Sequence, residues 1–297
     1  MSTSSDLPEV SSNTSEIHID GGVTTPYTRT EIEISDALDQ LVYGSEPRFI
    51  DKFTNPEIGD MVVYKIPGNS SLSDPVKTLE SKIFSEQSSY EEGFIEEHFS
   101  IYDANSTFLM LVDTQGISPR LVGGLRIIDC NEGPCETVSM FKEFYGEDTP
   151  LPVELARQET RERVWDILTV VIDPEYRDGI SSAWLYHALY RMTGEEDVQY
   201  WIANITPKEM RNLREYIGVP FEEIPGVDEV VDISPIDGKE SKYGFYSMEV
   251  PNIFPAIATR IGQLESPDVV DEGINAMFAR IARLVLLGTS KTDVPNQ

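Results

Sequence analysis

The stretch Trp165-Asp-Ile-Leu-Thr-Val-Val-Ile-Asp-Pro-Glu-Tyr-Arg-Asp-Gly-Ile-Ser-Ser-Ala183 decides the fold of this chain. Its first half is rich in Trp, Ile, Leu and Val, which predicts a buried strand over 163–172. Pro174 ends that strand, because proline cannot continue a ladder of backbone hydrogen bonds. A helix is predicted over 180–192, where apolar residues recur at steps of three and four. The stretch is therefore a strand, a short turn and a helix.

The turn between this strand and this helix has the composition of an anion site. Exposed amides at a helix N-terminus and the helix dipole attract a phosphate, small residues let the backbone come close, and an arginine adds charge. The residues concerned are Arg177, Gly179, Ser181 and Ser182. An ordinary turn capped by a serine explains the same residues equally well.

The chain on both sides of this stretch continues the alternation of strands and helices. Upstream we expect a strand over 61–66, a helix over 75–87, a hairpin of strands over 108–113 and 121–129, and a short helix over 138–145. An acidic loop bounded by prolines leads on to the central strand. Downstream, a strand over 200–205 precedes a helix that begins at Pro207 and stops at Gly218, and a strand over 242–250 follows. This order predicts one mixed α/β domain over 41–250.

The two ends of the chain differ from this domain. Residues 1–40 hold few large apolar side chains and many Ser, Thr, Asp and Glu, which predicts that most of this range is a disordered or loosely attached tail. Residues 251–297 are expected to form a helical extension. Its apolar stripe over 269–287 predicts a helix that docks on its own domain or, as the alternative, on a second copy of the chain in a homodimer.

The composition excludes some classes of function. The 297 residues include 52 acidic and 23 basic ones, so the formal charge is −29. Such a charge repels nucleic acid, whose non-specific affinity comes from Lys and Arg on the phosphates. No apolar run is long enough to span a bilayer, and the Ser-rich acidic N-terminus is unlike a signal peptide. The sequence therefore predicts a cytoplasmic protein without a membrane span.

The two cysteines are interpreted as free thiols. Cys130 and Cys135 lie five residues apart in a turn that contains Gly133 and Pro134. A local disulfide is the alternative, but thiols in a reducing cytosol are the simpler interpretation. No cluster of His and Cys accompanies them, so no metal site is expected.

The turn after the central strand resembles that of the Gcn5-related N-acetyltransferase superfamily. The acyl-CoA loop of that superfamily typically reads Arg or Gln, two residues, Gly, one residue, then Gly or Ala. Pro174-Glu-Tyr-Arg177 fits the approach to this loop, whereas Arg177-Asp-Gly179-Ile-Ser181 is one residue shorter and has Ser where Gly is usual. The resemblance implies a mixed, mostly antiparallel sheet flanked by helices.

Segments in the range 79–250 are similar, in order, to those of the acyl-homoserine-lactone (autoinducer) synthase branch of that fold. They are Ile83-Phe84-Ser-Glu86, Asp103 with Phe108-Leu-Met-Leu-Val, Val122-Gly-Gly124-Leu-Arg126-Ile-Ile, Gly133-Pro134, Met140-Phe141-Lys-Glu-Phe144 and Met210-Arg-Asn-Leu-Arg214-Glu-Tyr-Ile-Gly218-Val-Pro220. Two departures stand out, since Glu80 replaces an arginine of the family and Ser100 replaces its first gate acid. An acceptor other than S-adenosylmethionine is therefore expected.

The family also carries a Glu-x-x-Arg pair on its central strand, for which this sequence offers two registers. Glu154 and Arg157 keep both residue types, whereas Asp166 and Thr169 place the pair on the strand that leads into Pro174. The resemblance implies a carboxylate base, for which Asp166 and Glu154 are the candidates, and Tyr216 is a candidate acid. The implied substrate contacts are Phe84, Asp103, Arg126 and Arg157. The implied donor contacts are the amides near Val170 and Val171, together with Arg177, Gly179, Ser181 and Ser182.

These residues predict an N-acyltransferase that moves an acyl group from an acyl thioester to the amine of a small molecule or amino acid. The donor would be acyl-CoA or acyl carrier protein, with no metal. Two basic clusters, one of Arg157, Arg161 and Arg163 and one of Lys208, Arg211 and Arg214, could steer a carrier protein or simply pair with neighbouring glutamates. The alternative function is a non-catalytic relative that binds an acyl ligand or another protein.

Overall fold

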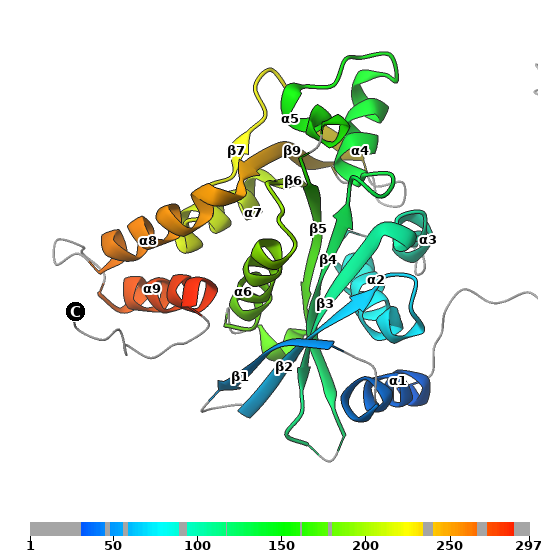
Figure 1. Ribbon diagram of the computed structural model, residues 1–297, viewed down its shortest axis with the longest axis vertical. Coiled ribbons are helices and arrows are strands. Elements are labelled where there is room, and N and C mark those ends of the chain that lie inside the picture. The colour runs from blue at the N-terminus through cyan, green and yellow to red at the C-terminus, as the bar shows by residue number, and fades with distance from the viewer. Residues whose placement is uncertain are drawn as a thin grey trace, which may run out of the picture.

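The strands of this protein form one sheet in the order β1-β2-β3-β4-β5-β6-β9-β7, with β8 paired to β9 as well (Figure 1). The structure, a computed structural model, describes residues 31–44, 48–55, 59–88, 94–116, 118–160, 162–177, 180–233, 240–265 and 272–287. The strands are β1 (Arg48–Asn55), β2 (Gly59–Pro67), β3 (Ser106–Asp113), β4 (Arg120–Asp129), β5 (Val164–Ile172), β6 (Tyr200–Ile205), β7 (Glu222–Glu223), β8 (Val230–Ile233) and β9 (Glu240–Glu249). Among these strands only β5 and β6 pair in parallel, and all other pairs are antiparallel. The predicted fold class is confirmed.

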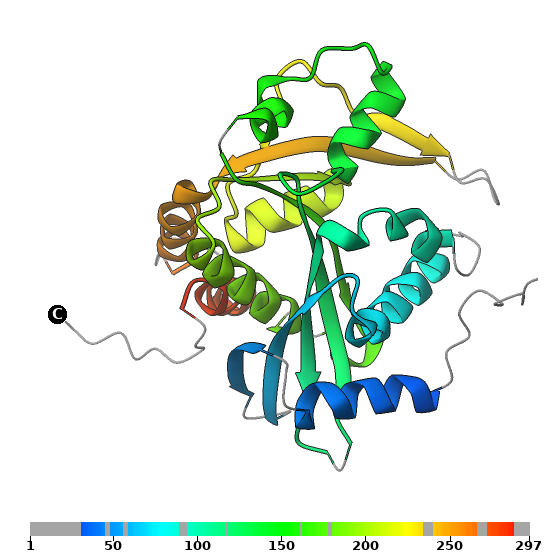
Figure 2. The same cartoon turned by 45° about the vertical axis from the view of Figure 1, so that its right-hand side comes forward.

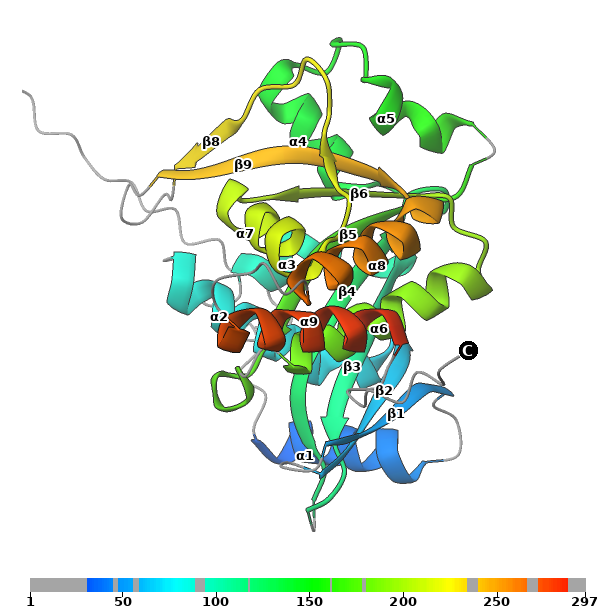
Figure 3. The same cartoon turned by 90° about the vertical axis from the view of Figure 1, so that its left-hand side faces the viewer.

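Helices cover both faces of the sheet. α1 (Glu31–Tyr43), α2 (Asp74–Ser88) and α3 (Phe94–Ser100) lie on one face (Figure 2). α6 (Ile180–Glu195), α8 (Ile253–Leu264) and α9 (Glu272–Leu287) lie on the other (Figure 3). α4 (Glu136–Tyr145) and the short α5 (Val153–Ala156) lie near β6 and β9, and α7 (Pro207–Asn212) follows β6. The central elements thus agree with the predicted ones.

The sheet is apolar on both faces because side chains alternate along each strand. In β3, Leu109 and Leu111 pack towards α6, whereas Phe108, Met110 and Val112 pack towards α1 and α2. All five are fully buried. A sheet covered on both faces accounts for the continuous apolar runs of the sequence.

The tail predicted over 1–40 is wrong for its last part. Residues 31–40 belong to α1, and Leu38 and Leu41 of that helix are buried against Val62 and Tyr64 of β2. These two leucines, with the partly buried Val42, fix the helix against the sheet. Residues 1–30 lie outside the described residues.

The last helix packs on the domain that precedes it. Ile281, Ala282 and Val285 of α9 share one core with Trp184 and Leu185 of α6. A ring nitrogen of His187, on α6, lies 2.9 Å from the carbonyl oxygen of Val285. Docking on its own domain is thus confirmed for α9. Within the described residues, no helix has the length and apolar character needed to cross a membrane.

Candidate functional site

The two parallel strands at the centre of the sheet separate soon after they begin. β5 pairs with β6 at Val164–Tyr200, Trp165–Trp201 and Asp166–Ile202. Beyond these pairs β5 stays paired with β4, and β6 stays paired with β9. The edges of β5 and β6 that would otherwise pair with each other therefore face a gap.

A β-bulge at Leu168 interrupts β5 where it borders this gap. In the ladder with β4, Thr169 pairs with Arg126 and Ile167 pairs with Ile127, so Leu168 has no partner of its own. The extra residue puts two successive side chains on the α2 and α3 face. Leu168 packs with Phe99, and the hydroxyl of Thr169 donates to the carboxylate of Glu80. Bulges of this kind are frequent next to active sites, where they re-aim side chains.

A cavity of about 1050 Å³ occupies the gap between the strands. Its walls come from both faces of the sheet, with α2, α3 and α4 on one side and α6, α9 and the helical turns after β6 on the other. The apolar side chains that line it are Ile83, Phe84, Phe94, Ile95, Phe99, Met140, Phe144, Ile167, Leu168, Val170, Val171, Trp201, Ala203, Ile205, Leu213, Ile217, Phe221, Phe278 and Ile281. The cavity thus passes from one face of the sheet to the other.

The backbone of Val170 turns one amide into this cavity. The N–H of Asp173 donates to the carbonyl of Val122 on β4 at 2.9 Å. Because N–H groups alternate along a strand, Val171 also directs its N–H to β4, and Val170 directs its N–H away from β4. Val170 lines the cavity and lies beyond the last pair with β6. An N–H donor at this place could bind a carbonyl oxygen.

Polar side chains gather where α3 meets α4. The His98 ring nitrogen Nε2 lies 3.0 Å from Oε1 of Glu136, and both residues line the cavity. The buried Tyr102 also hydrogen-bonds Glu136, and burial together with this bond raises the pKa of the Tyr102 hydroxyl. Nothing in the sequence indicates this pairing, because 38 residues separate His98 from Glu136.

A buried group of charges lies behind the bulge, on the α2 side of β4. The guanidinium of Arg126 is 1% exposed, and it donates to Glu80 at 2.6 Å and to Asp103 at 3.1 Å. Lys77 pairs with the other carboxylate oxygen of Asp103 at 2.5 Å. The ring of Phe108 lies 4.5 Å from the guanidinium carbon. Arg126 and Asp103, two predicted substrate contacts, are thus joined through Glu80 to Thr169.

Asp166 faces α4 rather than the cavity. Its carboxylate is fully buried and accepts hydrogen bonds from the backbone N–H of Thr137 at 2.7 Å and from the Thr137 hydroxyl at 2.8 Å. Burial raises the pKa of Asp166 to about 7, and the hydrogen bonds from Thr137 act in the opposite direction. This carboxylate holds the N-terminus of α4, where a negative charge is favourable.

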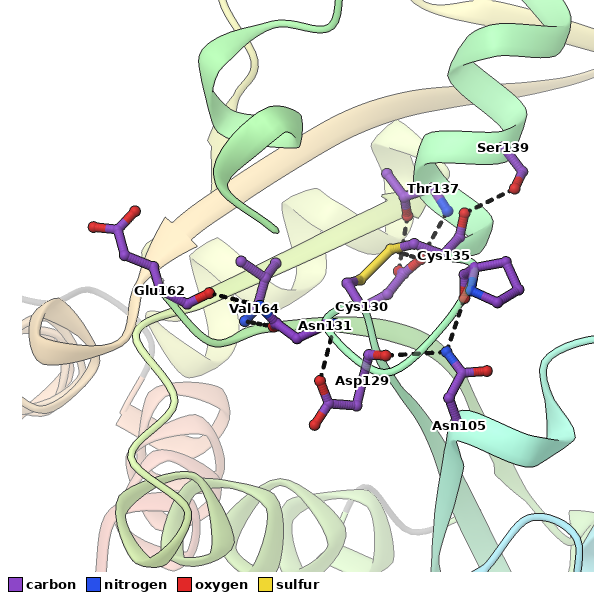
Figure 4. The surroundings of a disulfide bond; sticks show 11 residues. Asn105, Asp129, Cys130, Asn131, Cys135, Thr137, Ser139, Glu162 and Val164 are labelled. Atoms are coloured by element: carbon purple, nitrogen blue, oxygen red, sulfur yellow. Dashed lines mark hydrogen bonds between the residues drawn. A yellow bond between two sulfur atoms is a disulfide. The ribbon is translucent and has the colours of Figure 1, made fainter. Parts of the chain in front are cut away.

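The two cysteines are joined in a disulfide, so the interpretation as free thiols was wrong. The bond closes the turn between β4 and α4, beside which Asn105 donates to the carbonyls of Asp129 and Pro134 (Figure 4). Sulfur atoms of Cys130 and Cys135 lie within 4.8 Å of an Asp166 oxygen. In the disulfide they are not the thiolates that bind metals.

The predicted donor loop is described only in part. Arg177 is exposed, and its Nε donates to the carbonyl of Ile172 at 3.2 Å. Ser181 is buried and Ser182 lines the cavity, both in the first turn of α6. Gly179 lies outside the described residues. The start of α6 therefore adjoins the cavity.

The remaining predicted residues lie apart from this group. Glu154 belongs to α5, and Arg157 begins the 3-10 turn after it, so the register that put this pair on the central strand is wrong. The guanidinium of Arg157 packs over the ring of Tyr200 and pairs with Glu162 at 3.2 Å. Tyr216 lies in a π-helical turn, and its side chain is outside the described part. Phe84, by contrast, lines the cavity.

No protein-family model matches the sequence. A search of curated proteins also gave no match.

Solved structures of similar fold were found. The N-acyl amino acid synthase FeeM from uncultured soil microbes aligns over 71% of this chain and 94% of its own, at 14% identity and a TM-score of 0.46. The CoA-dependent acyl-homoserine lactone synthase BjaI aligns over 70% and 90%, at 14% identity and a TM-score of 0.46. A putative arylalkylamine N-acetyltransferase from the yellow fever mosquito aligns over 69% and 96%, at 12% identity and a TM-score of 0.41.

Proposed function

We propose that the chain is an N-acyltransferase that moves an acyl group from a thioester of CoA or acyl carrier protein to the amine of a small molecule or amino acid. The observation that carries the proposal is the cavity through the sheet, into which β5 turns the N–H of Val170. A thioester and an amine can approach such a cavity from opposite faces and meet at this amide. With a CoA donor, the reaction belongs in the cytoplasm.

The donor enters on the α6 face in this proposal. Ser182 lines the cavity at the start of α6, so the helix N-terminus and Arg177 can bind the pyrophosphate while the thioester reaches the gap. The N–H of Val170 then stabilises the negative oxygen that develops when the amine attacks the carbonyl. The apolar walls accept the acyl chain.

The acceptor enters on the opposite face, between α3 and α4. Glu136, Glu143 and His98 line the cavity there, so this entrance is acidic and suits a cationic amine. Glu80 and Asp103 add carboxylates nearby, but Arg126 and Lys77 already pair with them. We therefore infer that the acceptor binds at the entrance between α3 and α4, where Glu143 is exposed, and not in the buried group of charges.

The first prediction tests whether the cavity binds a thioester. Acyl-CoA of increasing chain length, from acetyl to dodecanoyl, is added while thermal unfolding is followed. A ligand present at about 100 times its dissociation constant stabilises the fold by about 2.7 kcal/mol. Ala203→Phe fills the cavity beside the gap and should weaken binding at least tenfold, because Ala203 is buried and lines it.

The matched control is Ala258→Phe, the same change at an exposed position of α8. It should leave the thermal shift as in the unaltered protein. Absence of any shift with acyl-CoA and with acylated carrier protein would contradict the proposal. Binding without acyl transfer to any amine of a broad panel would instead favour the non-catalytic alternative.

A further inference from the structure

We propose that His98 and Glu136 form the acid–base pair that takes the proton from the acceptor amine. This inference rests on the proposed function. The two side chains are 3.0 Å apart and both line the cavity that contains the amide edge of β5. They come from α3 and α4, which form the entrance opposite to α6.

The chemistry of the two groups fixes their roles. A carboxylate only accepts hydrogen bonds, so the Nε2–H of His98 donates to Glu136 and the other ring nitrogen, Nδ1, is the one that takes up a proton. Glu136 opens the first turn of α4, where the helix dipole favours its negative charge. A base that is oriented by a buried carboxylate is a general arrangement for proton transfer.

Contacts around the pair hold both side chains in place. Glu136 is 7% exposed and receives a second hydrogen bond from Tyr102. The imidazole of His98 stacks on Phe94, with ring centroids 5.8 Å apart, and meets the edge of Phe99 at 5.0 Å. The His98 side chain is 42% exposed, so a proton that it takes up can pass on to solvent.

The other ionisable groups near His98 suit this role less well. Glu143 lines the same entrance, and Glu96 and Glu97 flank His98 on α3. Glu97 and Glu143 are exposed, whereas Glu136 is buried beside His98. Asp166 on β5 lies close enough to Glu136 for that carboxylate to raise the pKa of Asp166, but the oxygens of Asp166 are already bonded to Thr137 and it is fully buried. From α2 the cavity receives the apolar Ile83 and Phe84.

The reaction can be written with its protons balanced. The acceptor arrives as an ammonium ion and gives one proton to Nδ1 of His98, which releases it to solvent. The freed amine attacks the thioester carbonyl, so a C–N bond forms and the C–S bond then breaks. The remaining proton on the attacking nitrogen ends on the sulfur of the leaving thiol. The products are an amide, a free thiol and one proton.

The second prediction concerns the loss of this base. His98→Gln should lower kcat by about 10² to 10⁴-fold, the usual contribution of a general base. We expect the rate of the unaltered protein to fall towards acid pH, and His98→Gln should remove this fall while the dissociation constant for acyl-CoA stays within about twofold. Glu136→Gln should move that fall to lower pH, because a carboxylate beside an imidazole favours its protonated form.

Two controls use matched changes. His187→Gln alters a histidine that lies outside the cavity, on α6, and should keep the fall in rate at acid pH. Glu97→Gln alters an exposed carboxylate next to His98 and should leave the pH profile unchanged. A wild-type rate and an unchanged acid limb in His98→Gln would overturn the inference while the acyltransferase proposal stands. An unaltered protein that transfers no acyl group to any amine would overturn both.

A second measurement does not depend on turnover. In the intact protein, ¹⁵N NMR of the imidazoles should show neutral His98 with its hydrogen on Nε2, and Glu136→Gln should relax this preference. A neutral His98 with its hydrogen on Nδ1 would overturn the inference, since that nitrogen could not then take the proton. The experiment also serves if His98→Gln fails to fold.

Discussion

At the scale of single residues, Asp166 is the group whose ionisation should be visible in the stability of the protein. Its pKa is raised from 3.8 to about 7, with burial as the largest cause. The folded protein therefore holds a proton that the unfolded chain releases near a pH of about 4. As the pH rises from about 4 to about 7, Asp166 makes the free energy of unfolding fall. The limiting slope is about 1.4 kcal/mol per pH unit.

Asp166→Asn removes this contribution, which gives the third prediction. The stability of the unaltered protein relative to the variant should fall between pH values of about 4.5 and about 7.5, as urea unfolding would measure. Glu97→Gln, the same change at an exposed carboxylate, is the control and should show no such trend in its difference from the unaltered protein. If the difference in the free energy of unfolding between the unaltered protein and Asp166→Asn does not vary with pH, the prediction is wrong. The carboxyl group of Asp166 would then have the same pKa in the folded and unfolded states.

Among single residues, those on β5 could be predicted from sequence and those at the α3 entrance could not. Asp166 and Thr169 lie on β5, whose continuous apolar run predicts a strand. The register that assigns the family pair to Asp166 and Thr169 therefore places both residues on the central strand. His98 and Glu136 lie 38 residues apart, on two different helices. No local pattern brings them together, and only the packing of α3 against α4 does so.

At the scale of elements, the turn between β4 and α4 is held by the disulfide and by side chains. Asn131 accepts from the N–H of Val164 at 2.8 Å and donates to the carbonyl of Glu162 at 2.9 Å. These bonds tie the turn to the start of β5. Because α4 carries Glu136 in its first turn, the turn also positions the carboxylate that orients the proposed base, His98.

The fourth prediction is that the disulfide adds a modest stability to this region. The cysteines are 5 residues apart, and closing so short a loop contributes about 2 kcal/mol in the chain-entropy description. Cys130→Ser with Cys135→Ser should lower the free energy of urea unfolding by about this amount. A reductant should do the same to the unaltered protein and should leave the double variant unaffected. Alkylation of both cysteines in the native, unreduced protein would contradict the prediction.

Sequence periodicity found the long elements and missed the short or polar ones. β3, β4, β5 and α6 each have an apolar pattern that can be recognised within the element's own sequence. α1 presents Leu38, Leu41 and the partly buried Val42 to the core, and β1 stands at the edge of the sheet. Such elements are stabilised by their neighbours in space, so their own sequences carry little signal. The bulge at Leu168 depends in the same way on the pairing of β4 with β5.

At the scale of the whole molecule, the formal charge of −29 acts against an anionic donor. Charges of one sign slow the approach of a ligand of the same sign, and salt screens them over a Debye length that falls from about 10 Å at about 0.1 M to about 3 Å at about 1 M. Hydrogen bonds and ion pairs between a bound donor and the start of α6 act at short range, so salt screens them less. The association rate constant of acyl-CoA should therefore depend on salt more strongly than its dissociation rate constant does.

The fifth prediction is that the association rate constant of acyl-CoA rises with ionic strength, by about tenfold between about 0.05 and about 0.5 M NaCl. Stopped-flow fluorescence with a fluorescent acyl-CoA measures it directly. The matched ligand is the same acyl group on pantetheine, which carries the thioester without the phosphates, and its rate constant should change little. A rate constant that falls with salt would show that local basic residues, such as Arg177 before α6 or Lys208 and Arg211 on α7, outweigh the charge of the whole molecule.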